Sequence, residues 1–275
     1  VLFEHTKGDV YLKERSYFGV HEVSVTPKLG DAWVLRNGVT VHGVQQREPS
    51  LRRIPGTYYH PTGPAGQVMG KLQSQPGNTG IVGLGAGALA SYTEAGDQVD
   101  FFEIDPVVAR IAEDSRYFTY LSDARERGVV TNIHLGDARL VLQQQPDSKY
   151  DLLVIDAFSS DAIPVHLATR EAVQLYLNKI NDKGLLLFHV SNHYLEMRPM
   201  LCNIADELSQ HCYYQENAVK TREEQQQAKT YSIWLLMGEP GALRKVLSPE
   251  WQRLTGNEDQ PVWRDDYSNI FQLLK

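Results

Sequence analysis

The sequence has little cysteine, no long hydrophobic run and no excess of positive charge. Its two cysteines, Cys202 and Cys212, are too few for a disulfide framework and form no CxxC zinc pattern, so we expect both to pack as small hydrophobic side chains in or near a helix. The longest apolar runs, 80–90 and 184–190, are far shorter than the ~20 residues that span a bilayer. The net charge of −7, from 27 Lys+Arg and 34 Asp+Glu, argues against non-specific nucleic-acid binding.

The rest of the composition is that of an ordinary globular protein. A length of 275 residues predicts about one to two domains, and a hydrophobic content of 42% excludes the disordered and collagen-like classes. No signal peptide is recognisable, so we expect a cytoplasmic location. The chain opens at Val1 rather than at Met, which leaves open a membrane domain upstream.

Residues 1–62 are predicted to form a small N-terminal domain of β-strands. β-Branched and aromatic residues recur there at strand spacing, and Asn37-Gly38 between two apolar runs is a strong hairpin signal. A stretch rich in Gly and Pro, 55–66, follows. We therefore expect a second, larger domain at 63–275.

In this second domain, strands and helices are predicted to alternate. Short, nearly continuous apolar strands are expected at 80–84, 98–104, 131–135, 150–155 and 184–190, with helices between them around 88–94, 106–114, 138–144, 168–179 and 197–210. Repeated βα units of this kind indicate an α/β fold with a mostly parallel sheet covered on both faces. Segments 213–219 and 230–237 are typical of a closing antiparallel hairpin, and the charged segment 220–229 between them of a solvated loop.

The carboxyl ends of the first two strands carry glycines and acids that suit a nucleoside. Ligands of doubly wound sheets bind beyond these ends. Gly83, Gly85 and Gly87 form a turn at which the backbone can approach a ligand, although a purely structural turn explains them about as well. The next strand ends in Glu103, placed to accept ribose hydroxyls, and in Asp105, placed to cap the following helix.

The third and fourth strands also end in carboxylates. Asp137 suits an adenine amino group, and equally a helix cap. Asp156 and Asp161 can hold an ammonium group between them and accept its proton, although Asp161 could instead form a turn. These acids indicate an adenosine site without phosphates beside an amine site. We expect no metal, because His189 and His193 do not share a helical face or a third ligand.

Together, these motifs resemble the spermidine synthase (polyamine aminopropyltransferase) family. The resemblance extends over nearly the whole chain, and several segments are most similar to the branch fused to membrane transporter-like helices: 17–20, 42–45, 58–61, 191–194 and 265–269. It implies a class I methyltransferase-like Rossmann sheet behind a small β domain, and it makes a homodimer plausible.

The resemblance also implies a reaction. Decarboxylated S-adenosylmethionine is the expected co-substrate, with its ribose on Glu103 and its adenine on Asp137. Asp156 takes the proton from a di- or polyamine, and Asp161 and Tyr59 bind that acceptor. The amine attacks the aminopropyl carbon next to the sulfonium, and methylthioadenosine leaves.

Two further residues are expected near the acceptor. His60 lies in the segment that should roof the site, and Asp266 lies in a segment that joins aromatic rings to acids, a combination that suits ammonium and methylene groups. His60 could instead satisfy backbone groups, and the segment of Asp266 could instead serve ordinary packing.

The sequence departs from the family pattern around the amine end of the donor. Ala86 stands where the glycine motif normally has an aspartate, His60 stands where a glutamine normally follows the tyrosine, and two extra residues separate the paired acids. Two alternatives therefore stay open. One is a methyltransferase that uses intact S-adenosylmethionine, and the other is a non-catalytic domain that binds a nucleoside or polyamine and regulates an attached membrane part.

Overall fold

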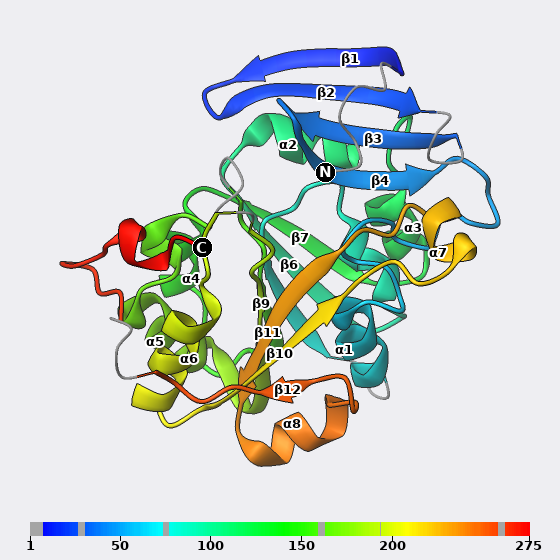
Figure 1. Cartoon of the computed structure of the whole chain (residues 1–275). Helices are drawn as coiled ribbons and strands as arrows, with labels where there is room; N and C mark the ends of the chain where they lie inside the picture. Colours follow the sequence, from blue (N-terminus) through cyan, green and yellow to red (C-terminus); the bar gives the residue numbers. More distant parts are fainter. Residues whose placement is uncertain (1–7, 27–30, 74–76, 159–162, 193, 258–261) are drawn as a thin grey trace.

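The chain forms two sheets (Figure 1) in a computed structural model that describes residues 8–26, 31–73, 77–158, 163–192, 194–257 and 262–275. The first is antiparallel, with its strands in chain order: β1 (Asp9–Ser16), β2 (Gly19–Thr26), β3 (Ala32–Asn37) and β4 (Thr40–Gln46). The predicted hairpin joins β3 to β4, and Gly38 at its tip has a φ of 58° that glycine adopts readily.

The second sheet has eight strands in the order β12-β10-β11-β9-β8-β5-β6-β7. Their bounds are β5 (Asn78–Val82), β6 (Gln98–Glu103), β7 (Val130–Leu135), β8 (Tyr150–Ile155), β9 (Ile180–His189), β10 (His211–Asn217), β11 (Ser232–Gly238) and β12 (Gln252–Arg253). The strands from β7 to β9 are parallel, and β11 is antiparallel to both of its neighbours. The predicted α/β sheet with a C-terminal antiparallel hairpin is confirmed.

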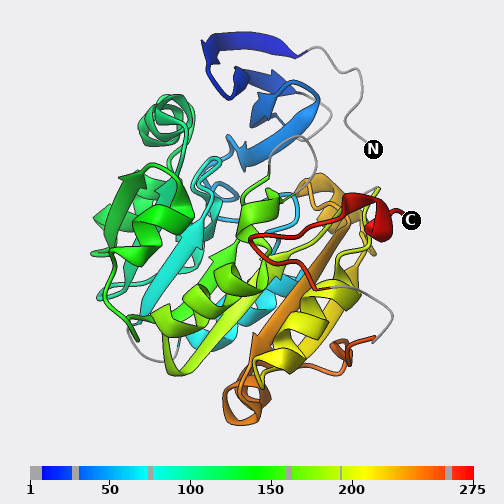
Figure 2. The ribbon, with the colours of Figure 1, turned by 90° about the vertical axis from the view of Figure 1, so that its left-hand side faces the viewer.

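Helices cover both faces of this sheet (Figure 2). One hydrophobic cluster packs α4 (Ala138–Gln143), α5 (Arg170–Lys179) and α6 (Arg198–Glu207) on one face, and the other packs α1 (Pro64–Leu72), α2 (Pro106–Glu113), α3 (Tyr120–Glu126) and α8 (Pro240–Val246). Neighbouring strand residues alternate between the clusters: Ile81 and Phe101 belong to one, and Val82 and Phe102 to the other. This two-sided burial explains why the strands are almost continuously apolar.

The chain changes direction at β5. After β5 the chain adds β6 and β7 on one side of that strand, and it then adds β8 and β9 on the other side. The topological switch point therefore lies at the carboxyl ends of the neighbouring strands β5 and β8. The small sheet lies over the carboxyl end of β5. The backbone carbonyl of His42, on β4, contacts the turn that follows β5. Short 3-10 helices complete the fold: η2 (Ala88–Tyr92), η3 (Val165–Leu167) and η4 (Ile270–Leu273).

The segment 220–229 is mostly exposed, as predicted, but it contains a short helix and two buried charged residues that the prediction of a solvated loop did not include. It contains α7 (Arg222–Gln226), which begins with a capping box between Thr221 and Glu224. Glu224 and Lys229 are both buried, and the Lys229 ammonium donates to Glu224 Oε1 at 2.6 Å and to Thr62 Oγ1 at 2.7 Å. Two charges of this segment therefore neutralise one another beneath the helix, while Lys220, Arg222 and Glu223 are exposed.

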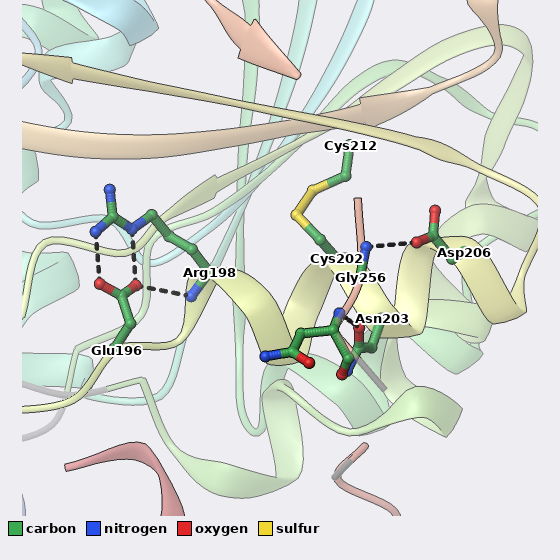
Figure 3. Close-up of a disulfide and its surroundings, with 8 residues drawn as sticks. Glu196, Arg198, Cys202, Asn203, Asp206, Cys212 and Gly256 are labelled. Atoms are coloured by element: carbon green, nitrogen blue, oxygen red, sulfur yellow. Dashed lines mark hydrogen bonds and ion pairs between the residues drawn. A yellow bond between two sulfur atoms is a disulfide. The ribbon is translucent and has the colours of Figure 1, made fainter. Parts of the chain in front are cut away.

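The two cysteines form a disulfide, which corrects the prediction that they are independent hydrophobic side chains. Cys202 lies on α6 and Cys212 on β10, with their Cα atoms 5.5 Å apart (Figure 3). Both side chains are buried, as expected, but α6 packs directly on β10 and so brings them within bonding distance. Along the parts of the chain that the structure describes, no helix is both long and apolar enough to cross a membrane.

Candidate active site

The turn after β5 requires glycine because other backbone segments come very close to it. Gly83, Gly85 and Gly87 have φ angles of 99°, 54° and 79°. A Cβ on Gly83 would lie 2.5 Å from the carbonyl oxygen of Asp156, and one on Gly85 would lie 2.4 Å from that of His42. The predicted glycine turn therefore lies between the end of β8 and the small sheet, where a side chain would collide with backbone.

Glu103 is buried at the end of β6, beside this turn. Its Oε2 accepts a hydrogen bond from the Leu84 amide at 3.0 Å, and its Oε1 accepts one from the Asp105 amide at 2.9 Å. Burial raises the pKa of the Glu103 carboxyl. The two amides hold the carboxylate in one orientation at the mouth of the strand, which suits a ligand that offers paired hydroxyls.

Asp105 caps α2, as predicted, and it also attaches the small sheet to the larger domain. Its Oδ1 accepts from the Val107 amide at 2.9 Å. Its Oδ2 accepts from the Ser16 hydroxyl at 2.5 Å and lies 2.6 Å from His21 Nε2. Burial on its own would raise the pKa of Asp105, but the hydrogen bonds from Ser16, Val107 and His21 lower it overall.

Asp137 follows β7 and caps α4, accepting from the Leu140 amide at 3.0 Å. Its second carboxylate oxygen lies 2.9 Å from His166 Nε2. A cavity of about 430 Å³ lies beside this pair, lined by Arg139, Val165, His166, Thr169, Arg264, Asp265 and Ser268. The partner of Asp137, His166, therefore lines a polar cavity formed partly by the C-terminal segment.

Asp265, next to the predicted Asp266, makes the contacts that tie this C-terminal segment down. Arg139 donates to both of its carboxylate oxygens, at 2.7 and 2.5 Å, and the Thr169 hydroxyl donates to Oδ1 at 2.8 Å. Asp266 itself is exposed in the adjoining turn. Its proposed contact with an acceptor stays a prediction.

Asp156 lies at the switch point, directly after β8, and only 8% of it is exposed. Its amide donates to Val82 of β5 at 2.9 Å. The Tyr59 hydroxyl donates to Oδ2, and His189 Nδ1 lies 2.7 Å from Oδ1. Burial, followed by the nearby Asp156 charge, raises the pKa of Tyr59 well above its usual value, so Tyr59 stays a donor.

His189 is the residue that sequence reasoning missed, since it was considered only as a metal ligand. The register of the sheet explains its position: β8 and β9 pair Ile155 with Phe188, so the next residues, Asp156 and His189, are neighbours. An acid and a histidine at the ends of two strands were visible in the sequence. Their adjacency was not, because it depends on the pairing register.

His60 is buried and turned toward α7. Its Nε2 lies 2.7 Å from Gln227 Oε1, and its Nδ1 lies 3.0 Å from Thr62 Oγ1. Burial lowers the pKa of His60, so it is neutral at physiological pH. Asp161 and His193 lie outside the described residues. Among the residues that are described, no three His, Cys, Asp or Glu side chains group as a metal ion would require.

Comparison with known proteins finds one curated relative and several solved structures with this fold. The chain is 32% identical to the polyamine aminopropyltransferase of Vibrio vulnificus (strain CMCP6) over 164 residues, which are 57% of this chain and 50% of that protein. The chain thus matches about half the length of this relative. No family model matches the sequence.

Among solved structures, a probable spermidine synthase from Corynebacterium glutamicum ATCC 13032 is 15% identical, with a TM-score of 0.62 over 97% of this chain and 99% of that one. The spermidine synthase from Thermotoga maritima is also 15% identical, with a TM-score of 0.54 over 90% and 81%. At this identity the two structures show the fold. The fold of this chain is therefore that of these two structures, and its sequence is similar to the polyamine aminopropyltransferase over half of that protein's length.

Proposed function

We propose that the chain is a polyamine aminopropyltransferase. It transfers the aminopropyl group of decarboxylated S-adenosylmethionine to a di- or polyamine and releases methylthioadenosine. The observation that carries this proposal is the buried Asp156 carboxylate, which Tyr59 and His189 hold at the switch point next to the glycine turn. The relative from Vibrio vulnificus supports it over half of that protein's length.

The order of the strands supports one direction for the donor. The strands β8, β5, β6 and β7 are consecutive in the sheet, and their carboxyl ends carry Asp156, Gly83, Glu103 and Asp137, in that order. With strands ~4.8 Å apart, the three steps cover about 14 Å, a span suited to an extended nucleoside that carries a short chain. The adenine would lie near Asp137 and the ribose at Glu103. The sulfonium would cross the turn of Gly83, Gly85 and Gly87 toward Asp156.

The proposed chemistry is an in-line displacement. The acceptor nitrogen forms a bond to the aminopropyl carbon, and the bond from that carbon to sulfur breaks, with its electron pair going to the sulfur. An amine with a pKa near ~10 is mostly protonated at neutral pH, so the nitrogen must lose a proton to react. Asp156 accepts that proton, while Tyr59 stays protonated and orients the carboxylate. Asp161 would hold a second ammonium group.

One observation, at Ala86, favours the methyltransferase alternative. The Ala86 methyl packs against β4 at Gly43, where an added Cβ would lie 2.3 Å from it. Alanine offers no carboxylate for the ammonium group of a decarboxylated donor. Intact S-adenosylmethionine is therefore the competing donor to test, and a regulatory domain that only binds the nucleoside is the remaining alternative.

The test is methylthioadenosine release from decarboxylated S-adenosylmethionine with a panel of di- and polyamines. We expect release that depends on an amine and falls by at least about a hundredfold in Asp156→Asn. Asp31→Asn, on the exposed side chain of an ion pair with Arg47, is the matched control and should be unaffected. Binding of the nucleoside without release would contradict the proposal and favour the regulatory domain.

A further inference from the structure

A chain of hydrogen bonds leads from the backbone of β11 to the Asp156 carboxylate. The Ile233 amide donates to Ser191 Oγ at 2.8 Å, and Ser191 Oγ lies 2.7 Å from His189 Nε2. On the other side of the ring, His189 Nδ1 lies 2.7 Å from Asp156 Oδ1. Both ring nitrogens are therefore engaged, in a site where the His189 and Asp156 side chains are only 3% and 2% exposed.

These partners assign the tautomer of the imidazole. A carboxylate oxygen can only accept, so Nδ1 must carry the proton that it donates to Asp156. The Ser191 hydroxyl has a proton to donate and lies 2.7 Å from Nε2, so Nε2 accepts from it and carries no proton. The other acceptor for that hydroxyl, the Ile233 carbonyl, is 3.5 Å away, at which distance a hydrogen bond is weak.

Aromatic rings fix the orientation of the imidazole. Trp234 stacks on His189 with ring centroids 4.5 Å apart and an angle of 19° between the planes. Tyr58 and Phe158 contact the same ring at 4.2 and 4.7 Å. The ring cannot turn without displacing these neighbours, so Nδ1 stays directed at Asp156.

We infer that His189 is a positioning residue for the proposed transfer: as the neutral Nδ1–H tautomer, set by Ser191, it holds one oxygen of Asp156 in place. This inference rests on the proposed function. Tyr59 donates to the other oxygen, so the carboxylate has donors on both sides and one orientation. The substrate amine then meets a base whose free lone pairs are already aimed, and no rotation of the carboxylate is needed during the reaction.

Three substitutions separate positioning from packing. His189→Ala removes the donor, whereas His189→Asn places an amide N–H near the position of Nδ1 and His189→Gln places one near Nε2. By analogy with residues that orient metal ligands, we expect Ala and Gln to lower kcat by roughly tenfold to a hundredfold, with the KM for the donor changed by less than about threefold. Asn should recover most of the loss. Equal losses in Asn and Ala, or a loss confined to KM, would overturn the inference.

The tautomer can be measured without any activity. In protein labelled with ¹⁵N-histidine, long-range ¹H–¹⁵N spectra distinguish a protonated Nδ1 from a protonated Nε2, and the signal missing in His189→Asn identifies the residue. We expect Nδ1 of His189 to be protonated and Nε2 to be unprotonated. A protonated Nε2 would refute the inference even if aminopropyl transfer is found. If the protein is inactive with every amine, the proposed function is refuted, and the spectrum still decides the tautomer of His189.

Discussion

At the scale of single residues, the candidate site depends on donors that face a buried carboxylate. Asp156 has Tyr59 on one oxygen and His189 on the other, and Glu103 has a backbone amide on each. Donors of this kind fix the direction of a carboxylate. A carboxylate held in one direction is what binding an ammonium group in a defined place requires.

Tyr59→Phe tests this arrangement with little change of volume. Removing a hydrogen bond to a charged group costs about 1.5–3 kcal/mol, so we expect the rate of methylthioadenosine release to fall by roughly tenfold to a hundredfold. The fold should be retained, because the ring still packs near Trp234. Tyr214→Phe, which loses only a hydrogen bond to Gln252, is the matched control. Equal rates in both variants would show that the Tyr59 hydroxyl has no role.

At the scale of elements, α7 shows how a charged segment can be held in place. The helix is short, its one buried residue is Glu224, and this carboxylate pairs with the buried Lys229 ammonium. Burial alone would raise the pKa of Glu224, but hydrogen bonds from Lys229, Thr62 and the Lys220 amide lower it to about 2. Since the folded pKa lies below the ordinary 4.5, this group stabilises the fold above about pH 4.5, and the stabilisation is lost as the pH falls toward 2.

Glu224→Gln should therefore destabilise the protein in a pH-dependent way. Leaving Lys229 buried without its partner costs roughly 3 kcal/mol or more at pH 7. The difference from the unmodified protein should shrink between about pH 4.5 and pH 2, because Glu224 itself becomes neutral there. Urea unfolding at several pH values measures it. Glu223→Gln, on the exposed neighbour, should stay within about 0.5 kcal/mol, and a difference independent of pH would refute the explanation.

The disulfide between α6 and β10 is expected to stabilise the folded protein. Its two cysteines are 10 residues apart, and closing a loop of that length in the unfolded chain contributes about 3 kcal/mol to stability. A reductant should lower the unfolding midpoint of the protein and leave that of the Cys202→Ser/Cys212→Ser double variant unchanged. If reduction changes neither midpoint, the bond does not stabilise the fold.

At the scale of the whole molecule, local patterns were readable in the sequence and contacts between distant segments were not. The strands, the glycine turn and the acids at Glu103, Asp137 and Asp156 follow from periodicity and from the chemistry of strand ends. Two contacts depend instead on how the chain packs: His189 reaches Asp156 through the register of β8 and β9, and Glu224 reaches Thr62 although 162 residues separate them.

Several predictions about the organisation and location of the molecule are still predictions. These are the domain boundary at residue 62, a homodimer, a cytoplasmic location and the branch fused to membrane helices. The contacts of Asp105 with Ser16 and His21 bear on the first, because they join the small sheet to the mouth of β6.

The most direct test of the central claim is the mass of the amine product when both donors compete. The protein would be given decarboxylated and intact S-adenosylmethionine together with one polyamine, and the product analysed by mass spectrometry. We predict an acceptor that is heavier by one aminopropyl group, formed together with methylthioadenosine and absent with Asp156→Asn. An acceptor that gains only a methyl group would contradict the account and make the chain a methyltransferase.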